Sequence, residues 1–310
     1  MVKRVVNRKV KSKERSFRIV DALLLILTLL PFLCGILLYV LLEPASEGIE
    51  IAGARIYFTI NMPLQNLPIT ESQVNSWLVI IAVFFLCLYL THGISATHPT
   101  RRQHFVELAI EKSENLVLEN MGEYFKDFAP FVGAVMVLSV CSSLLTLIGL
   151  YPPTSDLNVV AGWALLVFIL ITYYKFKCGF VHYLKSFGDP VPFLAPLNVI
   201  SEVATPVSMA FRHYGNVLSG TVISALVAAG LQGLTKIIFG NLPGFLGQFP
   251  FLQIGLPAVL SVYFDLFSGC LQAFIFAMLT MLYIATGFPK DDYKEKLKKK
   301  NAQLKLQKSN

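Results

Sequence analysis

The chain has 310 residues, of which 55% are hydrophobic and only 15% are charged. Its mean hydropathy is +0.62. A soluble protein this apolar would lack the polar surface to cover itself, so we interpret the chain as an integral membrane protein. Sixteen of the 26 lysines and arginines lie in two tails, at 1–18 and 290–310. A nucleic-acid-binding protein carries its basic residues on a folded face, so basic tails argue against nucleic acid and favour contact with anionic membrane lipid.

Six apolar segments are each long enough to cross a hydrocarbon layer of roughly 30 Å, which takes about 20 residues. They lie at 19–42, 76–92, 128–151 and 157–174, followed by two longer segments around Arg212 and Asp265. We therefore predict an all-α integral membrane protein with about six membrane segments, the last two long and strongly tilted. Segment 101–127 is polar and rich in helix formers, which is typical of an amphipathic helix on the cytoplasmic surface.

The loop charges predict the orientation in the membrane. An even number of spans puts both basic tails on one side, where the positive-inside rule expects the cytoplasm. The loops expected inside carry seven basic residues: Arg101, Arg102, Lys112, Lys126, Lys175, Lys177 and Lys185. The first outer loop carries acidic residues against the single Arg55: Glu43, Glu47, Glu50 and Glu71. The apolar run 19–42 exceeds the roughly 7–15 residues of a signal-peptide core, so we expect an uncleaved anchor.

The cysteines do not form a pattern. All five lie in or beside the apolar segments, with no close pair: Cys34, Cys87, Cys141, Cys178 and Cys270. We interpret them as small buried hydrophobic residues and expect neither a disulfide framework nor a metal site.

Two isolated charges lie in the last two apolar segments. Between Glu202 and Lys236 the only charged side chain is Arg212, and between Lys236 and Lys290 the only one is Asp265. A charge at membrane depth costs about 3 kcal/mol or more, so each is a functional-site hypothesis. Asp265 could pair with another helix, hold a proton or face water.

Arg212 lies on a polar face of its segment. As one helix, 198–235 would run to about 55 Å, so it must be steeply tilted or broken. With helical spacing, a set of small polar residues shares the face of Arg212: Ser201, Thr205, Ser208, Asn216 and Ser219. Such a stripe could be a packing seam between helices, but packing alone would not require an arginine. Thr221 lies on the opposite face.

Two further groups of polar residues have alternative interpretations. Ser261, Asp265, Ser268 and Gln272 recur at intervals of four, three and four, and Gln272 could simply form an interhelical hydrogen bond. The run Pro152-Pro153-Thr154-Ser155-Asp156 closes a helical hairpin. Asp156 and Asn158 there could cap a helix at the water boundary or line a polar entrance from outside.

The run Phe211-Arg212-His213-Tyr214-Gly215-Asn216-Val217-Leu218-Ser219-Gly220 resembles the arginine motif of subunit a of the F-type ATP synthase, where Leu-Arg-Leu-Phe/Tyr-Gly-Asn is usual. Other motifs of that family match in order at 69–77, 128–130, 152–158, 192–198 and 264–284. The resemblance covers about 69–286. It divides the chain into a basic cytoplasmic tail (1–18), an extra membrane anchor (19–42), an extracytoplasmic loop (43–68), the subunit a domain (69–286) and a second basic tail (287–310).

The resemblance implies a function in the membrane sector. In this family two tilted helices lie against a rotating c-ring whose hairpins bear carboxyl groups, and ions reach and leave the ring through two half-channels. Arg212 would separate the channels, flanked by Asn216 and Gln272. The expected partners are the c-ring, the peripheral-stalk b subunits, membrane lipid and the translocated H⁺ or Na⁺, in the bacterial cell membrane. The chain shows no phosphate-binding loop, so we expect no cofactor and no enzymatic activity of the isolated chain.

Two positions depart from the family pattern. Many bacterial members carry a glutamate nine residues after the arginine and a histidine seven residues before the glutamine, where this chain has Thr221 and Asp265. We interpret this as a carboxylate that has moved to the neighbouring helix within one half-channel. The residues predicted to line the ion pathway are Asp265, Thr221, Asp156, Asn158, Glu202, His213 and Ser208.

Two other functions compete with this interpretation. A stand-alone transporter or channel could use Arg212 to bind an anionic substrate at mid-membrane, but such folds usually contain two related halves and the sequence shows no internal repeat. An intramembrane hydrolase would need a nucleophile and a base. Only Ser208 and His213 suggest such a pair, and they lie on different faces of one helix.

Overall fold

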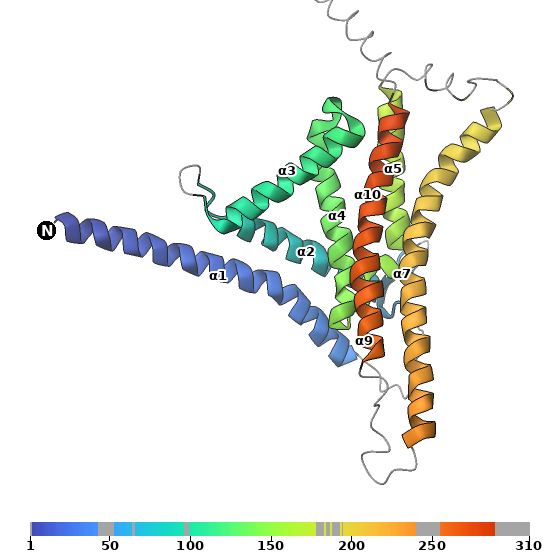
Figure 1. Ribbon diagram of the computed structural model, residues 1–310, viewed down its shortest axis with the longest axis horizontal. Coiled ribbons are helices and arrows are strands. Elements are labelled where there is room, and N and C mark those ends of the chain that lie inside the picture. Colours follow the sequence, from blue (N-terminus) through green and yellow to red (C-terminus); the bar gives the residue numbers. More distant parts are fainter. Residues whose placement is uncertain are drawn as a thin grey trace, which may run out of the picture.

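The fold is known from a computed structural model, which describes residues 2–42, 53–63, 66–95, 99–177, 195–239 and 255–288 and positions 183, 187 and 193. Only the backbone is described at 2–18, 239, 257, 258 and 261. The expectations for 43–52, Cys178, Lys185 and the tail 289–310 therefore concern residues outside this range. The long helices are α1 (Val2–Leu42), α2 (Glu71–Thr91), α3 (Arg101–Met121), α4 (Ala129–Leu144), α5 (Leu157–Phe176), α7 (Ala195–Phe239) and α10 (Gly269–Gly287) (Figure 1).

Short elements connect these helices. Three are 3₁₀-helices, η1 (Glu123–Phe128), η2 (Leu145–Ile148) and η3 (Pro153–Ser155). A short α9 (Leu256–Ser261) and a π-helix, η6 (Val262–Ser268), lead into α10. The strands β1 (Ile56–Ile60) and β2 (Leu67–Thr70) precede α2.

The described residues contain six segments long and apolar enough to cross a membrane, which confirms the all-α membrane fold. The first is Ile19–Leu42, as predicted. The second begins at Glu71, five residues before the predicted start, because Thr70 is extended and Glu71 opens the first turn, where a carboxylate favours the positive end of the helix dipole. The fifth segment is a single helix of 45 residues, about 68 Å long, and is not broken at Pro206.

Helix α7 leans across its neighbours. In Figure 1 its first half, drawn in yellow, diverges from α5 and α10, and its middle comes back against them. It contacts α5, η3, η6, α9 and α10. A helix of this length exceeds a roughly 30 Å layer about twofold, so the inclination follows from its continuity.

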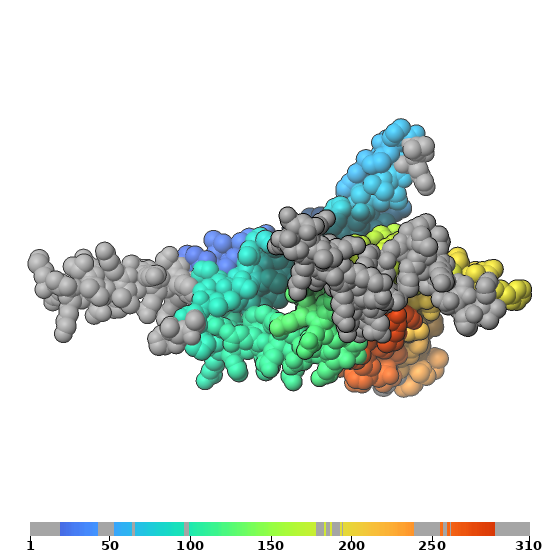
Figure 2. All heavy atoms as spheres, turned by 90° about the horizontal axis from the view of Figure 1, so that it is seen from above, coloured from blue at the N-terminus to red at the C-terminus, as the bar shows by residue number. Residues whose placement is uncertain are grey.

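Part of the predicted outer loop forms a β-hairpin. β1 pairs antiparallel with β2, with Ile56 opposite Thr70 and Ile60 opposite Leu67. The run Ile-Tyr-Phe-Thr-Ile consists of β-branched and aromatic residues, which favour extended backbone. Figure 2 shows this light-blue hairpin projecting beyond the helices.

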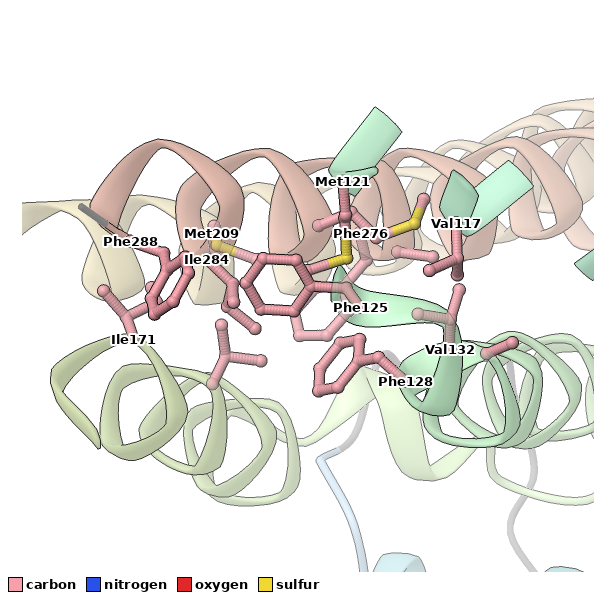
Figure 3. Close-up of a cluster of buried hydrophobic side chains, with 14 residues drawn as sticks. Val117, Met121, Phe125, Phe128, Val132, Ile171, Met209, Phe276, Ile284 and Phe288 are labelled. Carbon is pink, nitrogen blue, oxygen red and sulfur yellow. The ribbon is translucent and has the colours of Figure 1, made fainter. Parts of the chain in front are cut away.

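The main core lies where α3, η1, α4, α5 and α10 meet, with Met209 added from α7 (Figure 3). Phe125 lies at its centre, and its ring approaches those of Tyr174 and Phe288 at 5.1 and 5.4 Å between centroids. The predicted amphipathic helix contributes through one face only, because α3 buries Val117 and Met121 there. This core holds α4, α5 and α10 as a rigid support for α7.

Helix α1 packs mainly along α2 and diverges from the other helices (Figure 1). A polar contact joins them at one end, where Asp21 Oδ1 lies 2.9 Å from His92 Nδ1 and 3.3 Å from Arg102 Nη1. The prediction of buried cysteines is wrong for Cys34, Cys87 and Cys270, which are exposed. Lipid tails are about as apolar as a protein interior, so small hydrophobic residues of a membrane protein need not face inward.

Candidate functional site

Arg212 lies on the exposed face of α7. The polar stripe predicted from the sequence lies on the outside of the chain, with Ser201, Ser208, Asn216 and Ser219 exposed and Thr205 half-buried. The Arg212 side chain is exposed as well, and the ion pairs formed among the described residues do not include it. A packing seam would be covered by a neighbouring helix. This face is therefore open to a partner or to the surrounding membrane.

Asn216 and Gln272 are brought together by the fold. One turn after Arg212, the Asn216 Nδ2 donates a hydrogen bond of 2.6 Å to Gln272 Oε1 on α10. Gln272 is 3% exposed, so this contact provides a partner for an amide oxygen that would otherwise be buried without one. A net contribution of about 1 kcal/mol is typical of such a bond. It fixes α10 directly behind the part of α7 that carries Arg212.

Asp265 lies in the π-helix η6, beside α7. It shares a small recess of about 10 Å³ with residues from η6, α10, α7, the end of α4, η2 and the loop before η3, namely Ser143, Thr146, Pro152, Val217, Phe264, Ser268 and Gly269. That volume is about the size of one water molecule. The π-helix changes the regular spacing on which the predicted stripe depended, although Asp265 and Ser268 still face the same recess. The Ser261 side chain lies outside the described atoms.

Two close contacts hold the recess together. A Cβ on Gly269 would lie 2.6 Å from Ser143 Cβ, so α10 and α4 approach each other more closely than any other residue would allow. A Cβ on Gly220 would lie 3.1 Å from Phe264 Cβ. The residue next to Gly220 is Thr221, and the residue next to Phe264 is Asp265. The two positions of the proposed carboxylate exchange therefore lie on elements in direct contact.

The residues that line the recess around Asp265 do not include Thr221, His213 or Ser208. The Thr221 hydroxyl donates to the carbonyl of Leu218 at 2.8 Å. His213 is completely buried, its ring packs against Trp163 and Phe276, and neither ring nitrogen has a hydrogen-bond partner among the described residues. Ser208 is exposed. The nucleophile and base of a hydrolase are thus not brought together, and pathway roles for these residues stay predictions.

Glu202 belongs to a polar cluster at the opposite end of the bundle from Asp265. Lys175 Nζ lies 3.0 Å from Glu202 Oε1, and the Tyr183 hydroxyl donates to the same oxygen at 3.1 Å. Burial and, to a smaller extent, the neighbouring Glu202 carboxylate together raise the pKa of Tyr183 to about 12. From the sequence, Lys175 is expected only as a loop charge and Tyr183 carries no signal, since no local pattern connects either residue to Glu202.

Asp156 caps α5. Its Oδ1 accepts a hydrogen bond of 2.9 Å from the backbone N–H of Asn158, which supports the capping alternative. Its Oδ2 accepts a hydrogen bond from the Ser72 hydroxyl on α2. The Asn158 residue is exposed. Asp156 therefore also joins the first turns of α2 and α5, whatever part it has in ion flow.

Glu71 was counted among the acidic residues of the first outer loop, within the motif at 69–77 that resembles the start of the family's first helix. Glu71 is the first residue of α2 and is only 2% exposed. Its backbone N–H donates to the carbonyl of Arg55 at 2.7 Å. The local signal was Thr70 followed by an acidic residue before an apolar run, which marks a helix start. Its burial depends on the chain around Tyr151 and Arg55, which the sequence does not place.

Comparison with known proteins gives a consistent result. The profile of the family described as ATP synthase A chain matches residues 73–285. ATP synthase subunit a of Legionella pneumophila (strain Philadelphia 1) is 30% identical over 230 residues, 74% of this chain and 90% of the relative. That of Trichlorobacter lovleyi is 32% identical over 219 residues, 69% and 85% of the two chains. That of Moorella thermoacetica is 31% identical over 221 residues, 71% and 91%.

These matches cover both the Arg212 face of α7 and the part of α10 that bonds to it, and they confirm the resemblance found in the Arg212 motif. The chain therefore belongs to the ATP synthase A chain family, the family of ATP synthase subunit a.

Proposed function

We propose that this chain is the ion-conducting stator subunit of an F-type ATP synthase, with Arg212 between two half-channels that lead to and from the carboxyl groups of a rotating c-ring. The observation that carries the proposal is the position of Arg212. It lies exposed on α7, outside every ion pair of the described residues, on a face lined by small polar residues. Its partner is then a carboxylate from another chain.

The physical need for an arginine follows from the membrane. A ring carboxyl group that turns through lipid must be neutral, because an unpaired charge there costs about 3 kcal/mol or more. When it faces Arg212, the nearby positive charge favours the ionised form, and the ring site releases its ion. A guanidinium group does not release its proton in proteins, so the arginine cannot itself carry the ion. Ions therefore travel with the ring and do not pass directly from one half-channel to the other.

The polar residues at the two ends of the bundle suit the two half-channels. Asp265, in its recess between η6, α4 and α7, is the main titratable group of the outer one. Glu202, held by Lys175 and Tyr183, belongs to the inner one. Asn216 and Gln272 fix the two helices that flank the arginine. The ion, H⁺ or Na⁺, is selected mainly by the ring.

The rest of the assembly follows from the same assignment. The peripheral-stalk b subunits and membrane lipid are the other partners, and ATP is made and hydrolysed on other chains. The chain lies in the bacterial cell membrane with both basic tails in the cytoplasm. Residues 69–286 form the functional unit of this proposal, 19–42 an additional anchor and 43–68 an extracytoplasmic connection that contains most of the β-hairpin.

The test is Arg212→Ala in the complete complex, assayed by ATP-driven ion uptake in inverted membrane vesicles. We expect uptake to be abolished while the chain is still incorporated. Lys236→Ala is the matched control, because Lys236 is another exposed cation on α7 and should leave uptake unchanged. Uptake at the normal rate in Arg212→Ala would refute the proposal. Loss of uptake in both variants would indicate a general defect of α7.

A further inference from the structure

A cavity of about 290 Å³ lies at the end of the bundle where α1 ends and α2 begins. Its walls come from α1, the chain before β1, the start of α2 and the chain around η2: Tyr39, Gly53, Arg55, Glu71, Thr146, Gly149, Leu150, Tyr151 and Pro152. Such a volume has room for several water molecules. The cavity contains one acidic and one basic side chain, Glu71 and Arg55.

The Glu71 carboxyl group is buried without full compensation. The residue is 2% exposed, and its Oε1 has no hydrogen-bond partner among the described residues. Arg55 is near, yet its guanidinium lies over the Tyr39 ring, 5.3 Å from the centroid, and forms no ion pair with Glu71 in the described structure. Backbone groups of Tyr151 and Arg55 hydrogen-bond to the carboxyl group, but Oε1 stays without a partner, and an unsatisfied buried acceptor costs about 1–3 kcal/mol.

The cavity adjoins the recess that holds Asp265. Thr146 and Pro152 line both spaces. The Thr146 hydroxyl donates to the carbonyl of Ser143 at 2.5 Å, and Ser143 is itself part of the Asp265 recess. The space around Glu71 and the space around Asp265 therefore share the wall formed by Thr146 and Pro152.

We propose that Glu71 is the first proton-binding group of the outer half-channel and delivers protons towards Asp265. This inference rests on the proposed function, because it needs Asp265 to be part of the path. The Glu71 carboxylate takes a proton from a hydronium ion in the cavity, so an O–H bond of the hydronium breaks, the carboxyl O–H bond forms and neutral water is left. The carboxyl O–H bond breaks when the proton passes to water on the Thr146 side and onward to Asp265. The carboxylate is regenerated, so no atom or electron is consumed.

Arg55 has a positioning role in this scheme. A cation close to a carboxylate favours its ionised form, so Arg55 helps Glu71 to release each proton rather than retain it. Tyr39, Gly53, Arg55 and Glu71 all precede residue 73, where the family match begins. The end of α1 and the chain just before β1 thereby acquire a function. They build the mouth of the half-channel around a carboxylate.

The test uses the complete complex in inverted vesicles, with ATP-driven proton uptake and passive proton flow after removal of the catalytic sector. Glu71→Gln keeps the size of the side chain but cannot take up and release a proton, and we expect both rates to fall about tenfold. Glu71→Asp should restore most of the rate. Arg55→Gln should also slow flow. Glu119→Gln is the matched control, an exposed carboxylate on α3 that should have no effect.

Chemical rescue separates a proton-carrying role from a structural one. In Glu71→Ala the cavity is enlarged, and added formate should raise proton flow at least about threefold, since an exogenous carboxylate then replaces the missing relay. Any rise in proton flow that the same formate concentration causes in the unmutated complex is subtracted as background. A structural role would predict no rescue by formate and no recovery in Glu71→Asp.

Several outcomes would overturn the inference. Normal proton flow in Glu71→Gln would overturn it. Normal proton flow in Arg55→Gln would also overturn it, and this second variant decides the matter if the Glu71→Gln complex fails to assemble. Transport of Na⁺ without proton flow in the unmutated complex would also do so. If Arg212→Ala blocks uptake while Glu71→Gln does not, only this inference fails. If Arg212→Ala pumps normally, the proposed function itself fails.

Discussion

The side-chain amide of Asn216 donates a hydrogen bond of 2.6 Å to Oε1 of Gln272, although the two residues are 56 positions apart. One belongs to α7, four residues after Arg212, and the other is buried in α10. This bond couples the position of the arginine to the helix that packs against α4 and α5. The arginine thereby acquires a fixed location even though its own side chain is exposed.

A double-mutant cycle tests that coupling. Asn216→Ala and Gln272→Ala should each lower the free energy of unfolding in detergent by about 1 kcal/mol. The double variant should lose clearly less than the sum, because both single changes break the same bond. Ser219→Ala combined with Gln272→Ala is the control pair, since the Ser219 hydroxyl bonds only locally to the carbonyl of Asn216. Additive losses for Asn216 and Gln272 would contradict the coupling.

Asp265 and Thr221 test the proposed exchange of the carboxylate. Asp265→Asn removes the titratable group of the recess and should reduce ATP-driven ion uptake about tenfold or more. Thr221→Val should change it little, since the Thr221 hydroxyl bonds within its own helix. The reverse ranking would refute the exchange.

A relocation of the carboxylate provides a stricter test of the same idea. Gly220 touches Phe264, so residues 221 and 265 lie on adjoining elements. Asp265→His should be largely inactive on its own, and the combination Thr221→Glu with Asp265→His should recover part of the lost uptake. No recovery in the double variant, measured against Thr221→Glu alone, would show that the two positions do not share one path.

The cluster of Glu202, Lys175 and Tyr183 should make the free energy of unfolding depend on pH above pH 10, because of Tyr183. Its pKa is raised from 10.0 to about 12, so the folded state holds the phenol proton more tightly than the unfolded state. The contribution to stability is complete below pH 10 and is lost as the pH rises through about 12. Unfolding in detergent should show this loss, about 1 kcal/mol after allowance for solvent screening.

The comparison with Tyr183→Phe isolates this contribution from those of the other tyrosines. The variant should start less stable at pH 9 and approach the unmutated protein near pH 12. Tyr173→Phe serves as the control, because Tyr173 is exposed on α5 and should leave the difference between the two pH values unchanged. A constant difference between Tyr183→Phe and the unmutated chain across this range would contradict the contact with Glu202.

The orientation in the membrane can be tested with a single cysteine. In a chain whose native cysteines are replaced, Val5→Cys should react with a membrane-impermeant maleimide only when the cytoplasmic face is accessible, in line with the positive-inside rule. A cysteine at Phe58 on β1, 55% exposed, should label only from the opposite face. Labelling of both positions from the same side would overturn the predicted topology.

The sequence alone determined the membrane class, the six spans and the family. These properties depend on contiguous signals. An apolar run of about 20 residues must span the bilayer whatever surrounds it, and the Arg212 motif lies within one helix. The stripe from Ser201 to Ser219 could be predicted for the same reason, because helical periodicity alone decides which residues share a face.

Only the tertiary structure decided which polar residues meet and which are buried. Glu71 and Arg55 were expected as charges of the first outer loop, yet α2 begins at Glu71 and the Glu71 side chain is buried. His213 looked like a pathway residue and lies among aromatic rings. The π-helix at Asp265 and the bond between Asn216 and Gln272 likewise depend on how separate helices pack. Burial and pairing are set by contacts between distant segments, which local sequence patterns do not encode.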